Sequence, residues 1–198
     1  MHIFITREDQ YVPYSPRKAA QTIAFFALQT GASAVSVLKA VKLVYLADRE
    51  SVRRRGHPIQ DEVRVSMPHG PVNSVTYDFL SGSYDPEKSG WADYLTDRAN
   101  NIVGLAEENI TVDDLDELSQ SEIQILSDVW EQFGGMDRWA LRDWTHNADN
   151  VPEWKDPNGS SRRITLREIM DAVGVDHAKE RSREYQSLQK AQDLLASL

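Results

Sequence analysis

The sequence predicts a mainly α-helical fold with a small antiparallel β-sheet, with six or seven helices in a single compact domain. Three observations lead to this prediction. Apolar residues recur at three- and four-residue spacing through several long segments, which is the period of an α-helix. Serine or threonine followed three residues later by glutamate marks two helix starts. Short segments of alternating polarity between the helices indicate strands.

Two helices open the predicted domain. Ser15-Pro16 is a start signal, because serine caps free amides and proline at the first helical position gives up no hydrogen bond. We therefore expect a helix over 16–29. A second start at Ser33 leads into a longer helix, which ends in Arg53-Arg54-Arg55 before Gly56. Positive charge at this end suits the helix dipole.

The middle of the chain combines short strands with loops. Val63, Val65 and Met67 alternate with polar residues, which predicts a half-buried strand over 62–67 with the apolar side chains inward. The other expected elements are a helix over 73–80, an irregular loop over 81–101, and strands over 102–105 and 110–112 that can pair with 62–67.

The second half is helical. Capping boxes at Ser119 to Glu122 and at Thr165 to Glu168 start two helices, and a shorter helix is expected over 137–145. The last helix, over 177–197, carries a seam with a seven-residue period. The seam consists of Ala178, Arg181, Tyr185, Leu188, Gln192 and Leu195. It can pack on its own domain, on a partner, or on a second copy in a homodimer, and the pattern leaves these alternatives open.

Composition limits the function classes. There is no cysteine, which excludes thiol catalysis, disulfides and cysteine-ligated metal. The N-terminus lacks the pattern of a signal peptide, and no apolar run approaches the length of a membrane span, so we expect a cytoplasmic protein with no membrane contact. The net charge of −9 argues against direct nucleic-acid binding.

The charge is unevenly distributed along the chain. Residues 1–70 carry ten Lys and Arg against six Asp and Glu, whereas residues 71–135 carry two against fourteen. An acidic surface of this kind can steer a basic partner. The candidate partner-binding residues are therefore Glu107, Glu108, Asp113 and Asp114 in the acidic loop, together with Tyr185, Leu188 and Leu195 in the last helix.

No local motif supports an enzyme. The five histidines show no zinc-site spacing, and neither a phosphate-binding glycine loop nor a nucleophile elbow occurs. We expect no cofactor and no catalysis; a hydrolase built from Asp48, His69 and His146 would need the fold to bring them together. Trp139, Trp144 and Trp154 form an aromatic group, expected mainly in the core, although such groups also form binding hot spots.

Several segments together resemble the Panacea domain, the SocA-like antitoxin family. The segments are Lys42 to Arg49, Gly56-His57-Pro58-Ile59, Met67 to Val72 with Tyr77, and then Ser119 to Glu122, Leu141 to His146, and Pro152 with Trp154. The family-typical positions are Asp48, Gly56, Pro58, Gly70, Pro71, Tyr77, His146 and Trp154, which we interpret as mostly structural. The predicted organisation is an N-terminal extension (1–14), a Panacea-like domain (15–157) and a C-terminal helical extension (158–198) that packs on the domain or on a partner.

The resemblance implies an antitoxin that binds and neutralises a cognate protein toxin, either by masking it or by presenting it to a cellular protease. The alternative is a phage-encoded or regulatory protein that binds a host factor and has no paired toxin.

Overall fold

The computed structural model describes residues 13–96 and 99–196, so most of the predicted extension 1–14 lies outside the described residues. The helices are α1 (Pro16–Gln29), α2 (Val37–Arg55), α3 (Ser74–Leu80), α4 (Gln120–Phe133), α5 (Arg138–His146), α6 (Leu166–Ala172) and α7 (Ala178–Ala196). The strands are β1 (Ala34–Ser36), β2 (Arg64–Met67), β3 (Gly70–Asn73), β4 (Ile102–Gly104) and β5 (Arg162–Ile164), and η2 (Val112–Asp114) is a 3₁₀ turn. The predicted fold class, mainly α with a small antiparallel sheet, is confirmed.

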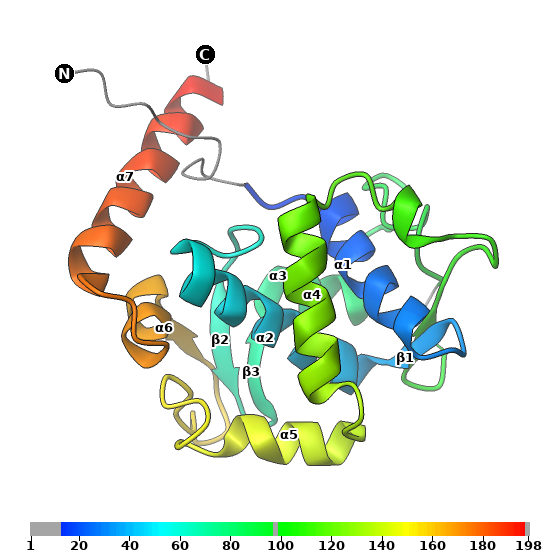
Figure 1. Cartoon of the computed structure of the whole chain (residues 1–198), viewed down its shortest axis with the longest axis horizontal. Helices are drawn as coiled ribbons and strands as arrows, with labels where there is room; N and C mark the ends of the chain where they lie inside the picture. Colours follow the sequence, from blue (N-terminus) through cyan, green and yellow to red (C-terminus); the bar gives the residue numbers. More distant parts are fainter. Residues whose placement is uncertain (1–12, 97–98, 197–198) are drawn as a thin grey trace.

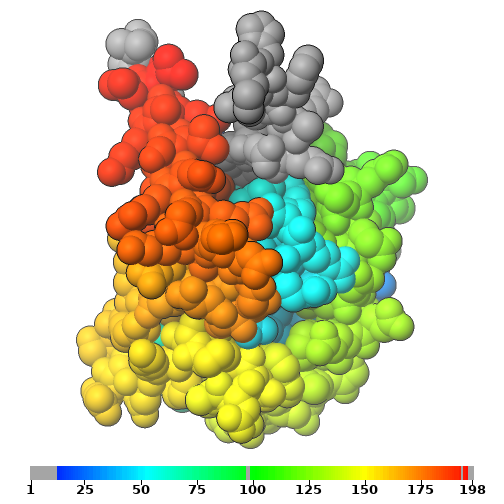
Figure 2. Space-filling view, turned by 60° about the vertical axis from the view of Figure 1, so that its left-hand side comes forward, coloured from blue at the N-terminus to red at the C-terminus, as the bar shows by residue number. Residues whose placement is uncertain are grey.

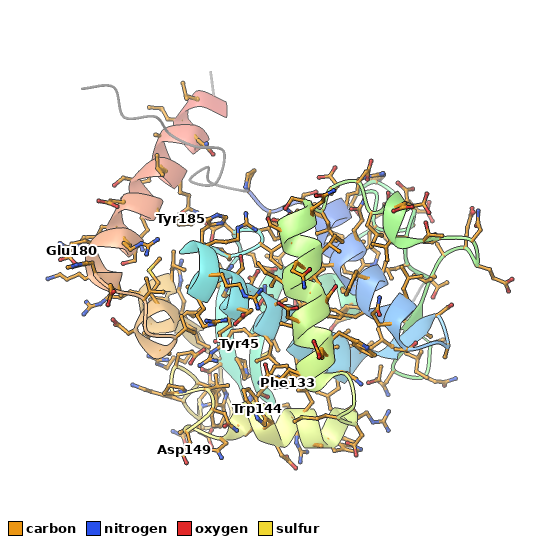
Figure 3. The ribbon with its side chains drawn as sticks, in the orientation of Figure 1. Tyr45, Phe133, Trp144, Asp149, Glu180 and Tyr185 are labelled. Carbon is orange, nitrogen blue, oxygen red and sulfur yellow. The ribbon has the colours of Figure 1, made fainter. Side chains whose placement is uncertain are left out.

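Helix α2 lies at the centre of the molecule, where α1, α4, α5, α6 and β3 all contact it (Figure 1). It separates two apolar clusters. The larger cluster joins α1, α2 and α4 and includes Phe26, Val41 and Leu126. The smaller one joins Tyr45 and Val52 of α2 to apolar residues between 151 and 178. Phe133 of α4 and Trp144 of α5 meet edge to face, with ring centroids 4.7 Å apart (Figure 3).

The predicted helix starts are confirmed with one correction. The Ser15 side chain caps α1, and both capping boxes form, at Ser119 for α4 and at Thr165 for α6. Helix α2, however, begins at Val37 and not near Ser33. The Ser36 hydroxyl accepts from the Lys39 amide and supplies the cap, while Ala34–Ser36 is used by β1.

The strand pairing differs from the prediction. Strand β2 is the central strand of a three-stranded antiparallel sheet of order β3-β2-β5. Strand β4 pairs with β1 and not with β2, and the segment expected as a strand over 110–112 leads instead into the 3₁₀ turn η2. The partner β5 was missed because it contains two arginines among its three residues and does not resemble a strand.

The alternation predicted for 62–67 is present, but its faces are reversed. Glu62, Arg64 and Ser66 are buried, whereas Val63 is 41% exposed. A buried charge is tolerated only when it is paired and hydrogen-bonded, and the partners of Arg64 and Glu62 come from elsewhere in the chain. The polar side chains therefore face the interior.

The first part of the segment after residue 158 packs on the rest of the fold. Strand β5 pairs with β2, and Ile164, Ile169 and Met170 complete the smaller apolar cluster. Figure 2 shows the C-terminal residues (orange) against the cyan segment that follows α2. Beyond its first turns α7 extends away from the domain, and Leu188, Leu194 and Leu195 are exposed (Figure 1).

Candidate functional site

A buried polar network surrounds Asp48 of α2. Its Oδ1 accepts from the Ile59 amide at 3.0 Å, and its Oδ2 accepts from both Nε and Nη2 of Arg64, at 3.0 and 2.8 Å. The Asn73 side chain donates to the same Oδ2 at 2.8 Å. Burial opposes the charge of Arg64, but the carboxylates of Asp48, Glu62 and Asp61 together outweigh burial and raise the pKa of the guanidinium. The network connects α2 with β2 and β3.

Glu62 extends this network to α3. Its carboxylate accepts from the Thr76 amide at 2.9 Å and from the Thr76 hydroxyl at 2.7 Å, and Asn73 donates to it at 3.0 Å. Burial raises the pKa of Glu62, although the Thr76 hydrogen bonds counteract this effect. One connected set of side chains therefore fixes the geometry of the β2–β3 hairpin relative to α2.

A second buried network lies on the same helix. The Tyr45 hydroxyl donates to Glu153 at 2.9 Å, and Arg49 Nε donates to the same carboxylate oxygen at 2.8 Å. Burial, followed by the Glu153 charge, raises the pKa of Tyr45. Tyr45 therefore lies well inside the fold, as Figure 3 also shows, and links α2 to the segment that follows α5.

Lys42 is another buried polar residue of α2. Its side chain is fully buried, and Nζ donates to the Pro71 carbonyl oxygen at 3.0 Å. No carboxylate of the described residues forms an ion pair with it. Burial therefore lowers the pKa of Lys42 to about 7. Gly70 leaves room for this side chain, because a Cβ at Gly70 would lie 2.8 Å from Nζ.

A groove opens above Lys42, between the start of α2, the β2–β3 hairpin and the start of α5. It has a volume of about 340 Å³. We call it the Trp139 groove; the residues that define it are Leu38, Lys42, Met67, His69, Tyr77, Arg138 and Trp139. None of the described residues that line it is acidic, although the chain contains 31 Asp and Glu.

Trp139 stands at the edge of this groove and is 50% exposed. The guanidinium of Arg138 lies 5.3 Å from its ring centroid, and that of Arg142 lies 5.1 Å away. Two cations near one indole hold the ring by cation–π attraction. The groove edge therefore combines a large aromatic surface with the guanidinium of Arg138, whereas that of Arg142 is paired with Asp143 at 2.5 Å.

Comparison with protein-family models matches residues 41–155, more than half of the chain, to the family described as "Antitoxin SocA-like, Panacea domain". The chain belongs to the SocA-like Panacea family. Neither the curated proteins nor the solved structures that were searched contain a match. We refer to residues 41–155 as the Panacea region. It contains both buried networks and most of the Trp139 groove, whereas α1, β5, α6 and α7 lie outside it.

The family-typical positions of the Panacea region have internal roles. Gly56 ends α2 with φ +79°, and Gly70 has φ +94°, a conformation that other residues rarely adopt. The Pro71 carbonyl accepts from Lys42, and Trp154 Nε1 donates to the Met67 carbonyl at 3.2 Å. Pro58 is buried. Tyr77 is half-buried and lines the Trp139 groove.

Both ring nitrogens of His146 face backbone carbonyl oxygens. Its Nδ1 lies 2.9 Å from the Arg142 carbonyl oxygen and its Nε2 lies 2.9 Å from that of Pro68. His69 is close by and lines a shallow depression together with His146. Asp48 does not line that depression, and its carboxylate is used by Arg64 and Asn73. Within residues 13–96 and 99–196, no group of three or more His, Asp or Glu is placed to hold a metal ion.

Many carboxylates of the acidic middle segment are paired within the fold. Arg17 of α1 contacts Asp93 at 2.9 Å and Asp116 at 3.2 Å. Lys18 forms a buried ion pair with Glu122 at 2.8 Å. The basic N-terminal part of the Panacea protein therefore neutralises part of the acidic segment that follows it.

The predicted partner-binding residues divide into two groups. Glu107, Glu108 and Asp113 are exposed, as are Leu188 and Leu195. Asp114 is exposed as well, but its carboxylate accepts from the Thr111 amide and hydroxyl and closes the η2 turn. Tyr185 is buried and stacks on His57 at 6.5 Å, on the face of α7 opposite to the exposed Glu180 (Figure 3). Tyr185 thus packs within its own chain.

Sequence reasoning missed the Trp139 groove. Its walls come from three segments that are far apart in the chain, and none of them carries a binding motif alone. Trp139 itself was assigned mainly to the core. The available signal was Asp137, which caps α5 and places Arg138 and Trp139 in the first turn of a short helix.

Among the described residues, no helix is both long and apolar enough to cross a membrane.

Proposed function

We propose that this protein is an antitoxin that binds a cognate protein toxin in the cytoplasm and neutralises it through protein–protein contact, without catalysis. The observation that carries the proposal is the match of residues 41–155 to the SocA-like antitoxin family. Family membership alone concerns the fold and the general role. The toxin and its contact surface have to be argued from the surface of the molecule.

The placement of the polar side chains supports a binding role. Asp48, Tyr45 and Arg49 are used to join α2 to its neighbours, and both nitrogens of His146 face backbone carbonyls. A general acid or base must be within hydrogen-bond reach of a substrate proton. Since the atoms of these groups already have partners inside the fold, they serve the scaffold on which a recognition surface is displayed.

Growth rescue tests the proposal. Cells would express the adjacent open reading frame alone, together with this protein, or together with an Asp48→Ala variant as a control with a weakened fold. We expect the neighbour to stop growth and the intact protein to restore it. A neighbour that stays lethal although this protein is abundant and soluble, and that forms no complex with it on co-purification, would contradict the proposal. A harmless neighbour would favour the binding of a host factor instead.

The level of the toxin in rescued cells separates two mechanisms. If neutralisation is by contact alone, the toxin accumulates in a complex with this protein. If the protein presents the toxin to a protease, the toxin level falls and recovers when the protease is removed. Either result is compatible with an antitoxin.

A further inference from the structure

We propose that the Trp139 groove is the surface on which the partner protein docks, through a segment that combines apolar side chains with at least one carboxylate. This inference rests on the proposed function, since it assumes a protein partner. It assigns the contact surface to the groove and not to the acidic loop around Glu107 and Glu108.

The first argument is the charge of the groove. The chain has a net charge of −9, yet no described residue of the groove lining is acidic, and Arg138 and His69 stand at its edge. Lys42 lines the floor with a side chain that is fully buried and donates to the Pro71 carbonyl, so the positive charge that a partner meets comes from Arg138 at the edge. Complementary potentials steer encounter and suppress incorrect partners. An acidic segment fits this lining, whereas a basic one does not.

The second argument is the exposed aromatic. Trp139 is the only tryptophan among the described residues that is half exposed, and two guanidinium groups hold its ring in place. Interface hot spots are enriched in Trp, Tyr and Arg that surround a pocket. Val37, Leu38, Val41, Met67 and Val72 supply an apolar lining next to this ring. The partner segment therefore needs apolar side chains beside its carboxylate.

The third argument is the support of the walls. The hairpin wall is fixed to α2 by the Asp48 and Glu62 networks, and its turn is held by the contact of His146 with the Pro68 carbonyl. A surface held in this way loses little conformational freedom on binding. The family-typical positions thus act on docking indirectly, by holding the groove in shape.

Growth rescue with surface variants is the first test. Trp139→Ala and Arg138→Glu alter exposed side chains and leave the buried networks intact. Their matched controls are Tyr84→Ala, another aromatic that is 48% exposed, and Arg167→Glu, an exposed arginine of α6. We expect the two groove variants to reduce colony counts in the rescue assay at least tenfold, and the two controls to rescue like the wild type. If the wild type rescues and the groove variants rescue equally well, the groove is not the docking surface, although the antitoxin proposal stands.

A second test does not depend on the toxin. A random dodecapeptide library displayed on phage would be selected on the full-length wild-type protein, and the enriched peptides would then be measured against Arg138→Glu and Arg167→Glu. We expect apolar peptides that contain Asp or Glu, with at least tenfold weaker binding to Arg138→Glu and unchanged binding to Arg167→Glu. Peptides that lack acidic residues, or that bind Arg138→Glu as well as the wild type, would overturn the inference even if the wild type rescues growth. If no neighbour is neutralised, this second test alone decides on the groove.

Discussion

Replacement of Lys42 by methionine should remove a specific pH dependence of stability. Burial lowers the pKa of Lys42 from 10.5 to about 7 in the folded chain. Between these values the unfolded chain binds a proton that the folded chain does not, so the free energy of unfolding rises with pH. Lys42 is half protonated at about pH 7, and each pH unit contributes at most about 1.4 kcal/mol. The expected gain between about pH 7 and about pH 9 is therefore about 2 kcal/mol.

The assay is urea denaturation of the wild type and of Lys42→Met at these two pH values. Other titrating groups are common to both proteins, so the difference between them isolates Lys42. Methionine has a similar length and fills the same space, so the two side chains differ mainly in the titrating amine. Lys88→Met is the matched control, because the Lys88 side chain is 87% exposed; it should follow the wild type. Equal pH responses of the wild type and Lys42→Met would refute the reasoning.

Three further predictions concern stability. Asp48→Ala should lower the free energy of unfolding by about 3–5 kcal/mol, because it leaves Arg64 buried without its carboxylate partner. Urea denaturation would measure this loss, and the double variant Asp48→Leu with Arg64→Met should recover part of it. Gly70→Ala should lower the free energy of unfolding by about 1–3 kcal/mol more than Gly82→Ala. Both glycines have positive φ, but only at Gly70 would a Cβ meet other atoms, namely Lys42 Nζ and Thr145 Oγ1. Equal melting temperatures of the two variants would argue against this. Ser119→Ala should lower the free energy of unfolding by about 1 kcal/mol, because α4 loses its cap. Thermal denaturation would measure this, and an unchanged melting temperature would mean that the capping box contributes nothing to stability.

The helix starts could be predicted because their signals are local. Ser15, Ser119 and Thr165 cap helices whose first turns follow at once in the chain. The family resemblance likewise pointed to Asp48 and Gly70 before their contacts were known. The reason for Asp48 appeared only in the fold, since its partners Arg64 and Asn73 follow it by 16 and 25 residues.

The face of β2 could not be predicted for the same reason. Arg64 looks like a solvent-facing residue until the carboxylate of Asp48 is known to lie opposite it. Charge totals were misleading in a similar way. The acidic middle segment is partly neutralised by Arg17 and Lys18, which a count along the chain cannot show. The Trp139 groove depends on three separated segments and has no signal in any one of them.

The pairing of β5 with β2 bears on how this protein can be shortened. A fragment cut at residue 155, where the family match ends, would lack the strand that pairs with Arg64, Val65 and Ser66. Their free backbone amides and carbonyls would then be open to any other chain, which is the usual origin of strand-mediated aggregation. The C-terminal segment therefore covers a strand edge of the Panacea region as well as extending that region.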